Sequence, residues 1–192
     1  RELATDAASK VTVNQNKYLE DLTNMLYEID SKLDSNSLMY VKLHQTVNRF
    51  IDDYNFKNIK KAPDTYDIYE ILNASDVLIS DYSSVMFDYL YSKKPIVLFL
   101  YDYEEYKQYR GFYFDVKETP FYKAYDTETL INYLNSDLIY SYDEYYSKFC
   151  LSFEKSFSKD FWDSISDDNL VNLKNEDKKY DIYFFDSVSN KS

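Results

Sequence analysis

Short, wholly apolar runs alternate with amphipathic stretches along the first half of the chain. Apolar side chains recur at three- and four-residue steps over residues 17–33, at Tyr18, Leu22, Met25, Leu26, Ile29 and Leu33. This spacing predicts an amphipathic helix. The runs 38–43, 77–79 and 96–100 are almost continuously apolar. Such runs are typical of strands that are buried on both faces of a parallel sheet.

Two further helices are predicted between these strands. Asp64 is a candidate N-cap for a helix through Leu72, and residues 85–91 form a mostly apolar stretch that ends before Pro95. The order strand, helix, strand, helix, strand has connections too long for hairpins. It therefore predicts an α/β fold with a parallel, Rossmann-like sheet, flanking helices and right-handed crossovers.

The second half of the chain has a weaker pattern. Asp126 is expected to begin a helix that runs to Leu134, and residues 138–157 form a helical stretch with an uneven apolar stripe. Residues 163–179 are polar, and 180–185 resemble a strand. We therefore predict one domain over 1–160, with 161–192 as a linker or the start of a following module.

Charge and composition exclude several classes of protein. The chain has 192 residues, with 22 Lys and Arg against 34 Asp and Glu, so its net charge is −12 and nucleic-acid binding is disfavoured. One cysteine and one histidine cannot form a structural zinc site. The longest apolar runs are far shorter than the roughly 20 residues of a membrane span. We therefore expect a soluble, cytoplasmic chain, and its start at Arg1, without an initiator Met or a leader, is interpreted as that of a fragment.

Polar residues follow each of the three predicted core strands: His44, the stretch 80–84 and Asp102. Ligands of open parallel sheets bind beyond the carboxyl ends of the strands. A helix that begins near Ser83 would also offer unpaired N–H groups to a phosphate. The chain lacks the glycines of a Walker loop or a dinucleotide fingerprint. The alternative is that the polar side chains of 81–84 only cap the helix.

Three other side chains are candidates for chemistry. His44 is the only histidine and can exchange protons near neutral pH, although a structural role is equally open. Arg110 precedes the only glycine, Gly111, and its guanidinium matches diphosphate oxygens; the alternative is a salt bridge to an acidic residue of 102–105. Asp88 lies in an apolar helix, so its carboxylate must be exposed, paired or used.

Several of these segments together resemble one known family. They are ASDVLISDYSSVMFDY at 74–89, KPI at 94–96, YDYEEY at 101–106 and RGFYFD at 110–115. They are similar to the donor-binding half of the CDP-glycerol glycerophosphotransferases, the teichoic acid primases and polymerases of Gram-positive bacteria. Lys42-Leu43-His44 resembles the Lys/Arg-x-His element of that family. The resemblance covers about residues 38–134.

The resemblance implies an architecture and an activity. The chain would be the C-terminal domain of a GT-B fold, truncated at its N-terminal side. The whole enzyme would transfer polyol phosphate from CDP-glycerol or CDP-ribitol to a lipid-linked polymer acceptor in teichoic acid or capsular polymer synthesis, releasing CMP. It would act at the inner face of the plasma membrane, without a metal, and the fragment alone would turn over little. Its partners would be the donor, the acceptor and the missing N-terminal domain, with no nucleic acid.

The resemblance also implies roles for individual residues. His44 would contact the donor phosphates or assist proton movement, and Arg110 would neutralise charge on the CMP leaving group. Ser83 and Ser84 would hold phosphate, while Asp81 and Asp88 would orient the loop or the glycerol. The expected substrate-binding set is Lys42, Ser80, Asp81, Ser83, Ser84, Asp88 and Gly111.

Two other functions remain open at this point. One is a glycosyltransferase of the same GT-B plan that uses a nucleotide-sugar, and the other is a non-catalytic docking domain. The chain departs from the family pattern at 119–122, where Thr-Pro-Phe-Tyr replaces a usual Pro-Gly-Pro element. It departs again from Ser156 onward, where the usual ending of the family is missing.

Overall fold

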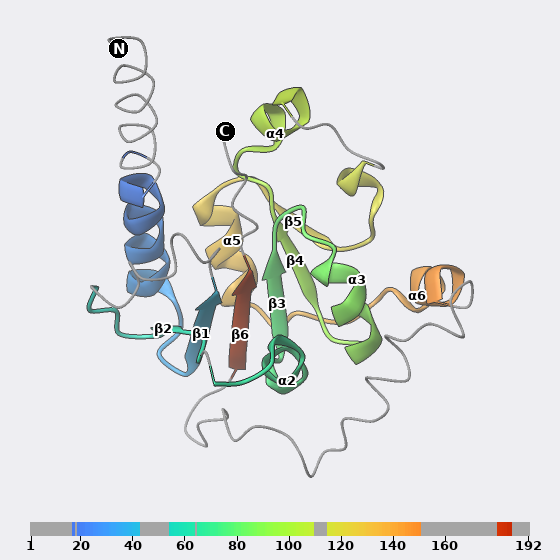
Figure 1. The fold of residues 1–192 in the computed structure, drawn as a ribbon, viewed down its shortest axis with the longest axis horizontal. Helices are drawn as coiled ribbons and strands as arrows, with labels where there is room; N and C mark the ends of the chain where they lie inside the picture. Colours follow the sequence, from blue (N-terminus) through green and yellow to red (C-terminus); the bar gives the residue numbers. More distant parts are fainter. Residues whose placement is uncertain are drawn as a thin grey trace, which may run out of the picture.

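Six parallel strands form one sheet, in the order β2-β1-β6-β3-β4-β5 (Figure 1). The computed structural model describes residues 17, 19–42, 54–63, 65–109, 115–150 and 180–185, with backbone alone for 109, 148–150 and 180–185. The strands are β1 Ser37–Lys42, β2 Ile59–Lys61, β3 Val77–Ser80, β4 Ile96–Phe99, β5 Tyr122–Ala124 and β6 Tyr180–Phe185. Helices flank this sheet, so the predicted α/β class is confirmed.

The three strands predicted from apolar runs are β1, β3 and β4. All four residues of β3 and of β4 are buried, as are the first five of β1. Alternate side chains of a strand point to opposite faces of the sheet. Continuous burial therefore requires a cover on both faces, which is why these strands lack an alternating polar pattern.

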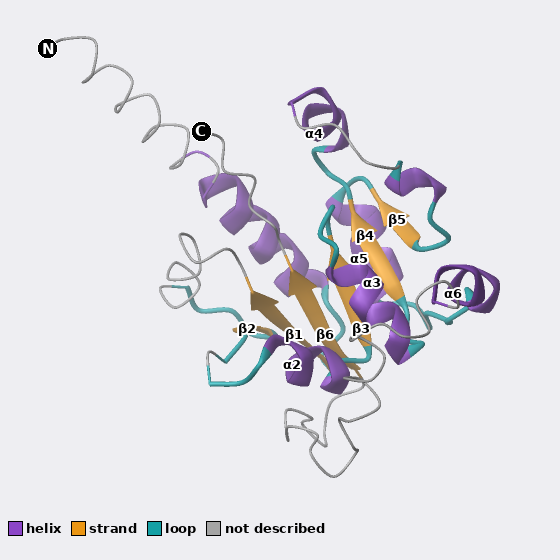
Figure 2. Ribbon diagram, turned by 45° about the vertical axis from the view of Figure 1, so that its right-hand side comes forward, coloured by secondary structure: helices purple, strands orange, loops and turns teal. Residues whose placement is uncertain are grey.

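Two hydrophobic cores lie on the two faces of the sheet (Figure 2). The first contains the helix at residues 19–32 and α5, Thr127–Leu134, packed against Met39, Ile79 and Val97. The second contains α2, Ile68–Ala74, and α3, Val85–Tyr89, packed against Leu38, Leu78 and Leu98. The helices on opposite faces thus fix the sheet from both sides.

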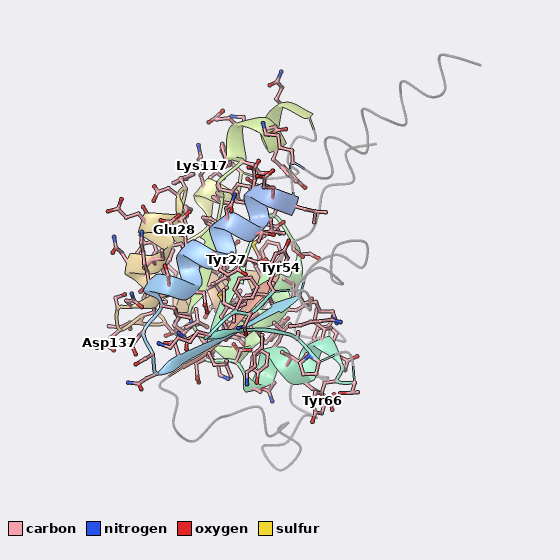
Figure 3. All side chains as sticks on the ribbon, turned by 90° about the vertical axis from the view of Figure 1, so that its left-hand side faces the viewer. Tyr27, Glu28, Tyr54, Tyr66, Lys117 and Asp137 are labelled. Carbon is pink, nitrogen blue, oxygen red and sulfur yellow. The ribbon has the colours of Figure 1, made fainter. Side chains whose placement is uncertain are left out.

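The N-terminal helix also packs against the segment before β2. The ring of Tyr27 lies 4.8 Å from that of Phe56 and 6.0 Å from that of Tyr54 (Figure 3). Asp30, one turn later, accepts hydrogen bonds from the N–H groups of Lys57 at 2.8 Å and Asn58 at 2.6 Å. Because Asp30 is only 9% exposed, these bonds fix the position of the β2 edge relative to the helix.

Strand β6 differs from the sequence-based expectation. Its six residues pair with β1 from Ser37↔Tyr180 to Lys42↔Phe185, and it also pairs with β3. The sequence pattern indicates that 180–185 begins a further module, because a polar stretch separates this segment from the rest of the pattern. Instead, it supplies backbone partners for two strands that do not pair with each other. The predicted linker over 161–179 lies outside the described residues, and the boundary at residue 160 stays a prediction.

Helix α2 begins later than predicted. Its N-cap is Asp67, whose Oδ1 accepts a hydrogen bond from the Tyr69 N–H at 2.9 Å. Glu70 completes a capping box by accepting the Asp67 N–H at 2.8 Å. This reciprocal pair satisfies two backbone donors at once, so it marks Asp67 as the helix start. The predicted N-cap, Asp64, lies outside the described residues.

The remaining helices are short. They are η2 Leu90–Ser92, α4 Tyr103–Tyr109, η3 Val116–Glu118 and α6 Asp143–Cys150. Of the helix predicted over 138–157, residues 138–142 are not helical and 151–157 lie outside the described part of the chain. Lys93, after η2, has a φ of 54°, the one positive φ of a non-glycine residue among those described. Within the same residues, no helix is both long and apolar enough to cross a bilayer.

Helix α5 begins as predicted, with Asp126 as its N-cap. The Asp126 carboxylate accepts the Thr129 N–H at 2.7 Å and the Thr129 hydroxyl at 3.0 Å. The backbone bond, followed by the hydroxyl bond, lowers the pKa of Asp126 below its ordinary value. The ionised carboxylate is therefore the form that stabilises the fold.

This shift predicts a pH-dependent cost for Asp126→Ala. A depressed folded-state pKa contributes stability above the unfolded value of about 4, and that contribution is lost as the pH falls through the lower folded value. We expect the variant to melt below the wild type at pH 7, with the difference closing as the medium becomes acidic. Thermal melts at several pH values measure this. A difference that stays constant with pH would contradict the assignment.

Candidate functional site

The carboxyl ends of the parallel strands bring several predicted residues to one edge of the sheet. Lys42 is the last residue of β1 and is half-buried, and Ser80 is the last residue of β3. Both are in register with Phe185 of the intervening β6. Lys42 and Ser80 therefore lie level with each other, two strand spacings or about 10 Å apart.

Ser80 and Asp81 are buried polar residues at this edge. Ser80 is fully buried and its Oγ has no hydrogen-bond partner within the described part of the chain, while Asp81 is 6% exposed. A buried hydroxyl without a partner is costly and uncommon in a folded protein. The hydroxyl of Ser80 is therefore a candidate to contact a ligand.

The loop after Ser80 is shaped by Asp81. Its Oδ1 accepts the N–H of Ser83 at 2.9 Å, and the Oγ of Ser83 accepts the N–H of Val85 at 3.4 Å. The N–H of Ser83, which the sequence assigned to phosphate, is therefore engaged within the loop. The Asp81 carboxylate is thus part of the turn that shapes the loop, and its role toward a ligand stays a prediction.

Ser84 is the exposed residue of this loop. It occupies the N-cap position of α3 but has helical backbone angles, φ −62° and ψ −13°, and makes no side-chain cap bond. Neither its N–H nor its hydroxyl has a hydrogen-bond partner among the described residues. The alternative that Ser84 merely caps the helix therefore lacks the bond it requires, and both donors remain available to an anion.

Tyr82 and Asp102 join this loop to the next one, and the sequence analysis missed the tyrosine. The Tyr82 hydroxyl donates a hydrogen bond to Oδ1 of Asp102 at 2.8 Å, and its ring stacks on Tyr106 of α4 with centroids 3.8 Å apart. Burial, followed by the Asp102 charge, raises the pKa of Tyr82 far above its usual value. The position of Tyr82 inside the polar stretch 80–84 was the available signal, which was hidden among 23 tyrosines.

A second tyrosine and aspartate pair lies between α4 and η3. The Tyr103 hydroxyl donates to both oxygens of Asp115, at 2.9 and 3.0 Å, and the Lys117 ammonium, labelled in Figure 3, lies 3.6 Å from the Tyr103 ring centre. Burial and then the Asp115 bond raise the pKa of Tyr103 to about 12. The Lys117 N–H contributes most to lowering the pKa of Asp115. These contacts join the two elements that flank residues 110–114.

Three of the predicted site residues cannot be placed. His44, Arg110 and Gly111 lie outside the described residues, so their roles stay predictions. Asp88 is half-buried and accepts a hydrogen bond at 3.5 Å from the hydroxyl of Tyr69 in α2. Its carboxylate is thus paired, one of the three outcomes expected for it.

The chemistry available at this edge is anion binding. It combines the Ser84 N–H and hydroxyl, the buried Ser80 hydroxyl and the ammonium of Lys42. Donors and a cation in this arrangement suit phosphate oxygens. In the described part of the chain, no group of three or more His, Cys, Asp or Glu side chains could hold a metal ion.

The chain is similar in sequence to several teichoic acid enzymes. The chain is 32% identical over 141 residues to the teichoic acid glycerol-phosphate primase of Bacillus subtilis (strain 168), covering 72% of this chain and 33% of that protein. It is 34% identical over 143 residues to the teichoic acid poly(glycerol phosphate) polymerase of the same strain, covering 70% and 19%. A 62-residue stretch is 49% identical to the teichoic acid poly(ribitol-phosphate) polymerase of Bacillus spizizenii (strain ATCC 23059 / NRRL B-14472 / W23), covering 32% and 9%.

The chain thus spans a third or less of the length of these relatives. The sequence pattern of the CDP-Glycerol:Poly(glycerophosphate) glycerophosphotransferase family matches residues 8–173, which include β1 to β5 and the loop 81–84. This match covers most of the chain and agrees with the resemblance found in its motifs. The chain belongs to the CDP-Glycerol:Poly(glycerophosphate) glycerophosphotransferase family.

Proposed function

We propose that this chain is the donor-binding domain of a CDP-polyol phosphotransferase. The enzyme transfers glycerol phosphate or ribitol phosphate from its CDP-linked donor to a hydroxyl of a lipid-linked acceptor, in teichoic acid or capsular polymer synthesis. The observation that supports this most is the family match over residues 8–173. The relatives include both glycerol-phosphate and ribitol-phosphate enzymes, so either polyol fits the proposal.

The edge formed by β1 and β3 supports a site for the donor diphosphate. Ser84 offers an N–H and a hydroxyl, Ser80 offers a buried hydroxyl, and Lys42 supplies positive charge in a chain whose net charge is −12. Phosphoryl transfer needs mainly positioning and stabilisation of charge on the phosphate oxygens. The donors and the cation at this edge are suited to both roles.

The chemical step follows from the donor. The acceptor hydroxyl oxygen bonds to the phosphorus that carries the polyol, the bond from that phosphorus to the CMP oxygen breaks, and the hydroxyl loses its proton. By the resemblance, His44 contacts the donor phosphates or assists this proton movement, and Arg110 neutralises the charge that CMP gains. The rest of the enzyme supplies the acceptor site and works at the inner face of the plasma membrane.

A thermal-shift panel tests this proposal on the purified chain. CDP-glycerol, CDP-ribitol, CMP, UDP-glucose and GDP-mannose are added separately. A ligand that binds only the folded state and is present at 100 times its dissociation constant adds about 2.7 kcal/mol of stability. We therefore expect a clear rise in melting temperature with at least one CDP-polyol and none with the nucleotide-sugars.

Two outcomes of the panel would contradict the proposal. A rise with UDP-glucose or GDP-mannose alone would indicate a glycosyltransferase of the same architecture. No rise with any nucleotide would favour a docking domain. Retained binding of the chain to a protein of the same polymer pathway would support that alternative.

A further inference from the structure

Tyr82 attaches the loop after β3 to the loop after β4. Its hydroxyl donates to Oδ1 of Asp102 at 2.8 Å, and its ring lies nearly parallel to that of Tyr106, at 26°. Strands β3 and β4 are neighbours in the sheet, and Asp102 lies between β4 and α4. The hydrogen bond and the stack therefore join two adjacent loops at the carboxyl edge, on the side where Ser80 and Ser84 lie.

The bonds of Asp81 and Ser83 have a different effect. Asp81 accepts the Ser83 N–H, and Ser83 accepts the Val85 N–H, so both bonds close turns within the loop. A local turn sets the shape of the loop but does not fix its position relative to β4. The bond from Tyr82 to Asp102 spans 20 residues of sequence and does fix that position.

The same bond also orients the negative charge of Asp102, which is unfavourable beside an anion site. Asp102 is a half-buried carboxylate beside a loop that offers hydrogen-bond donors to an anion. Tyr82 is a protonated donor at neutral pH, as a tyrosine of ordinary pKa already is, and burial and then the Asp102 charge raise its pKa further. The hydrogen bond therefore directs the negative oxygen of Asp102 toward Tyr82.

We propose that Tyr82 and Asp102 form a positioning pair that holds the Ser84 N–H in place for the diphosphate of a CDP-polyol. The pair rests on the proposed function, and it acts through the loop rather than by touching the reacting atoms. Its two components are the hydroxyl bond to Asp102 and the ring stack on Tyr106. Removing the hydroxyl alone keeps the stack, so Tyr82→Phe isolates the bond.

The test measures CDP-glycerol affinity by calorimetry on the purified chain. We expect Tyr82→Phe and Asp102→Ala each to weaken binding about tenfold, the effect of losing one hydrogen bond to a charged group. The double variant should be no weaker than either single variant, since both remove the same link. Asp102→Asn should bind within about threefold of the wild type, because its amide oxygen still accepts the Tyr82 hydroxyl.

Tyr122→Phe is the matched control. The Tyr122 hydroxyl donates to the carbonyl oxygen of Ile139 at 2.9 Å and accepts the Ile139 N–H at 3.3 Å, so its bonds join β5 to the segment after α5 and not to the loop after β3. This variant also loses the bonds of one tyrosine hydroxyl but should keep wild-type affinity. If Tyr82 had only a structural role, Tyr82→Phe would lower the melting temperature of the ligand-free chain as much as Tyr122→Phe does. Its affinity for CDP-glycerol would then equal that of the wild type.

Three results would overturn the pairing: Tyr82→Phe binding as tightly as Tyr122→Phe, effects that add in the double variant, or Asp102→Asn binding as weakly as Asp102→Ala.

If the wild-type chain does not bind CDP-glycerol, the proposed function fails, and hydrogen exchange then decides the positioning role. Faster exchange of amides 83–87 in Tyr82→Phe, with the strands unchanged, supports it. Unchanged exchange in 83–87 overturns it.

Discussion

Replacing Ser84 with aspartate is expected to weaken CDP-glycerol binding roughly 100-fold. A carboxylate at this position would stand where the donor phosphates approach and would repel them, and it would also compete for the loop N–H groups. Folding should be unaffected, because Ser84 is exposed and its side chain makes no cap bond. Calorimetric titration of the chain with CDP-glycerol measures the change.

Ser136→Asp is the control for the added charge. Ser136 is an exposed serine just beyond the end of α5, where the neighbouring Asn135 contacts the residues that precede β1. It therefore lies at the amino edge of the sheet and should bind donor as the wild type does. Equal weakening in both variants would point to the overall charge rather than to the loop, and wild-type binding by Ser84→Asp would exclude the loop from the site.

Asp30→Ala is expected to lower the free energy of unfolding by about 3 kcal/mol, since each buried donor left without an acceptor costs ~1–3 kcal/mol. The variant removes the acceptor for two backbone N–H groups, those of Lys57 and the buried Asn58. The carbonyl of Asn58 in turn accepts the N–H of Met39, so removing the Asp30 carboxylate also disturbs the register of β1. Urea denaturation at neutral pH measures the difference.

Glu28→Ala provides the comparison on the same helix. Glu28, labelled in Figure 3, pairs with Lys32 at 2.7 Å, and about half of each side chain is exposed. Exposed pairs at this spacing contribute little to stability. We expect this variant to unfold at nearly the same urea concentration as the wild type, and a similar loss in both variants would show that the buried hydrogen bonds of Asp30 are unimportant.

The core strands were predictable because burial on both faces leaves a direct mark on sequence. β1, β3 and β4 are apolar runs, and each is placed within one residue of its predicted start. The edge strands β2 and β5 have the sequences Ile-Lys-Lys and Tyr-Lys-Ala, which contain no apolar run. Edge strands of three residues have little buried surface to specify them, so composition gave no signal for either.

The site was predictable in outline, and its internal contacts were not. Strand ends and polar residues placed the loop 81–84 at the carboxyl edge, as the structure has it. Sequence alone could not separate Ser83, whose N–H bonds to Asp81, from Ser84, whose N–H is available. The bond between Tyr82 and Asp102 joins residues 20 positions apart, so it depends on strand order, which local periodicity does not contain.

The left-handed backbone of Lys93 has a consequence for the unfolded chain. Glycine adopts a positive φ without steric cost, whereas lysine meets strain there. With one glycine in 192 residues, however, the unfolded chain has fewer accessible backbone conformations than a glycine-rich chain of the same length. The chain therefore loses less conformational entropy on folding, and this smaller loss offsets the strain at Lys93.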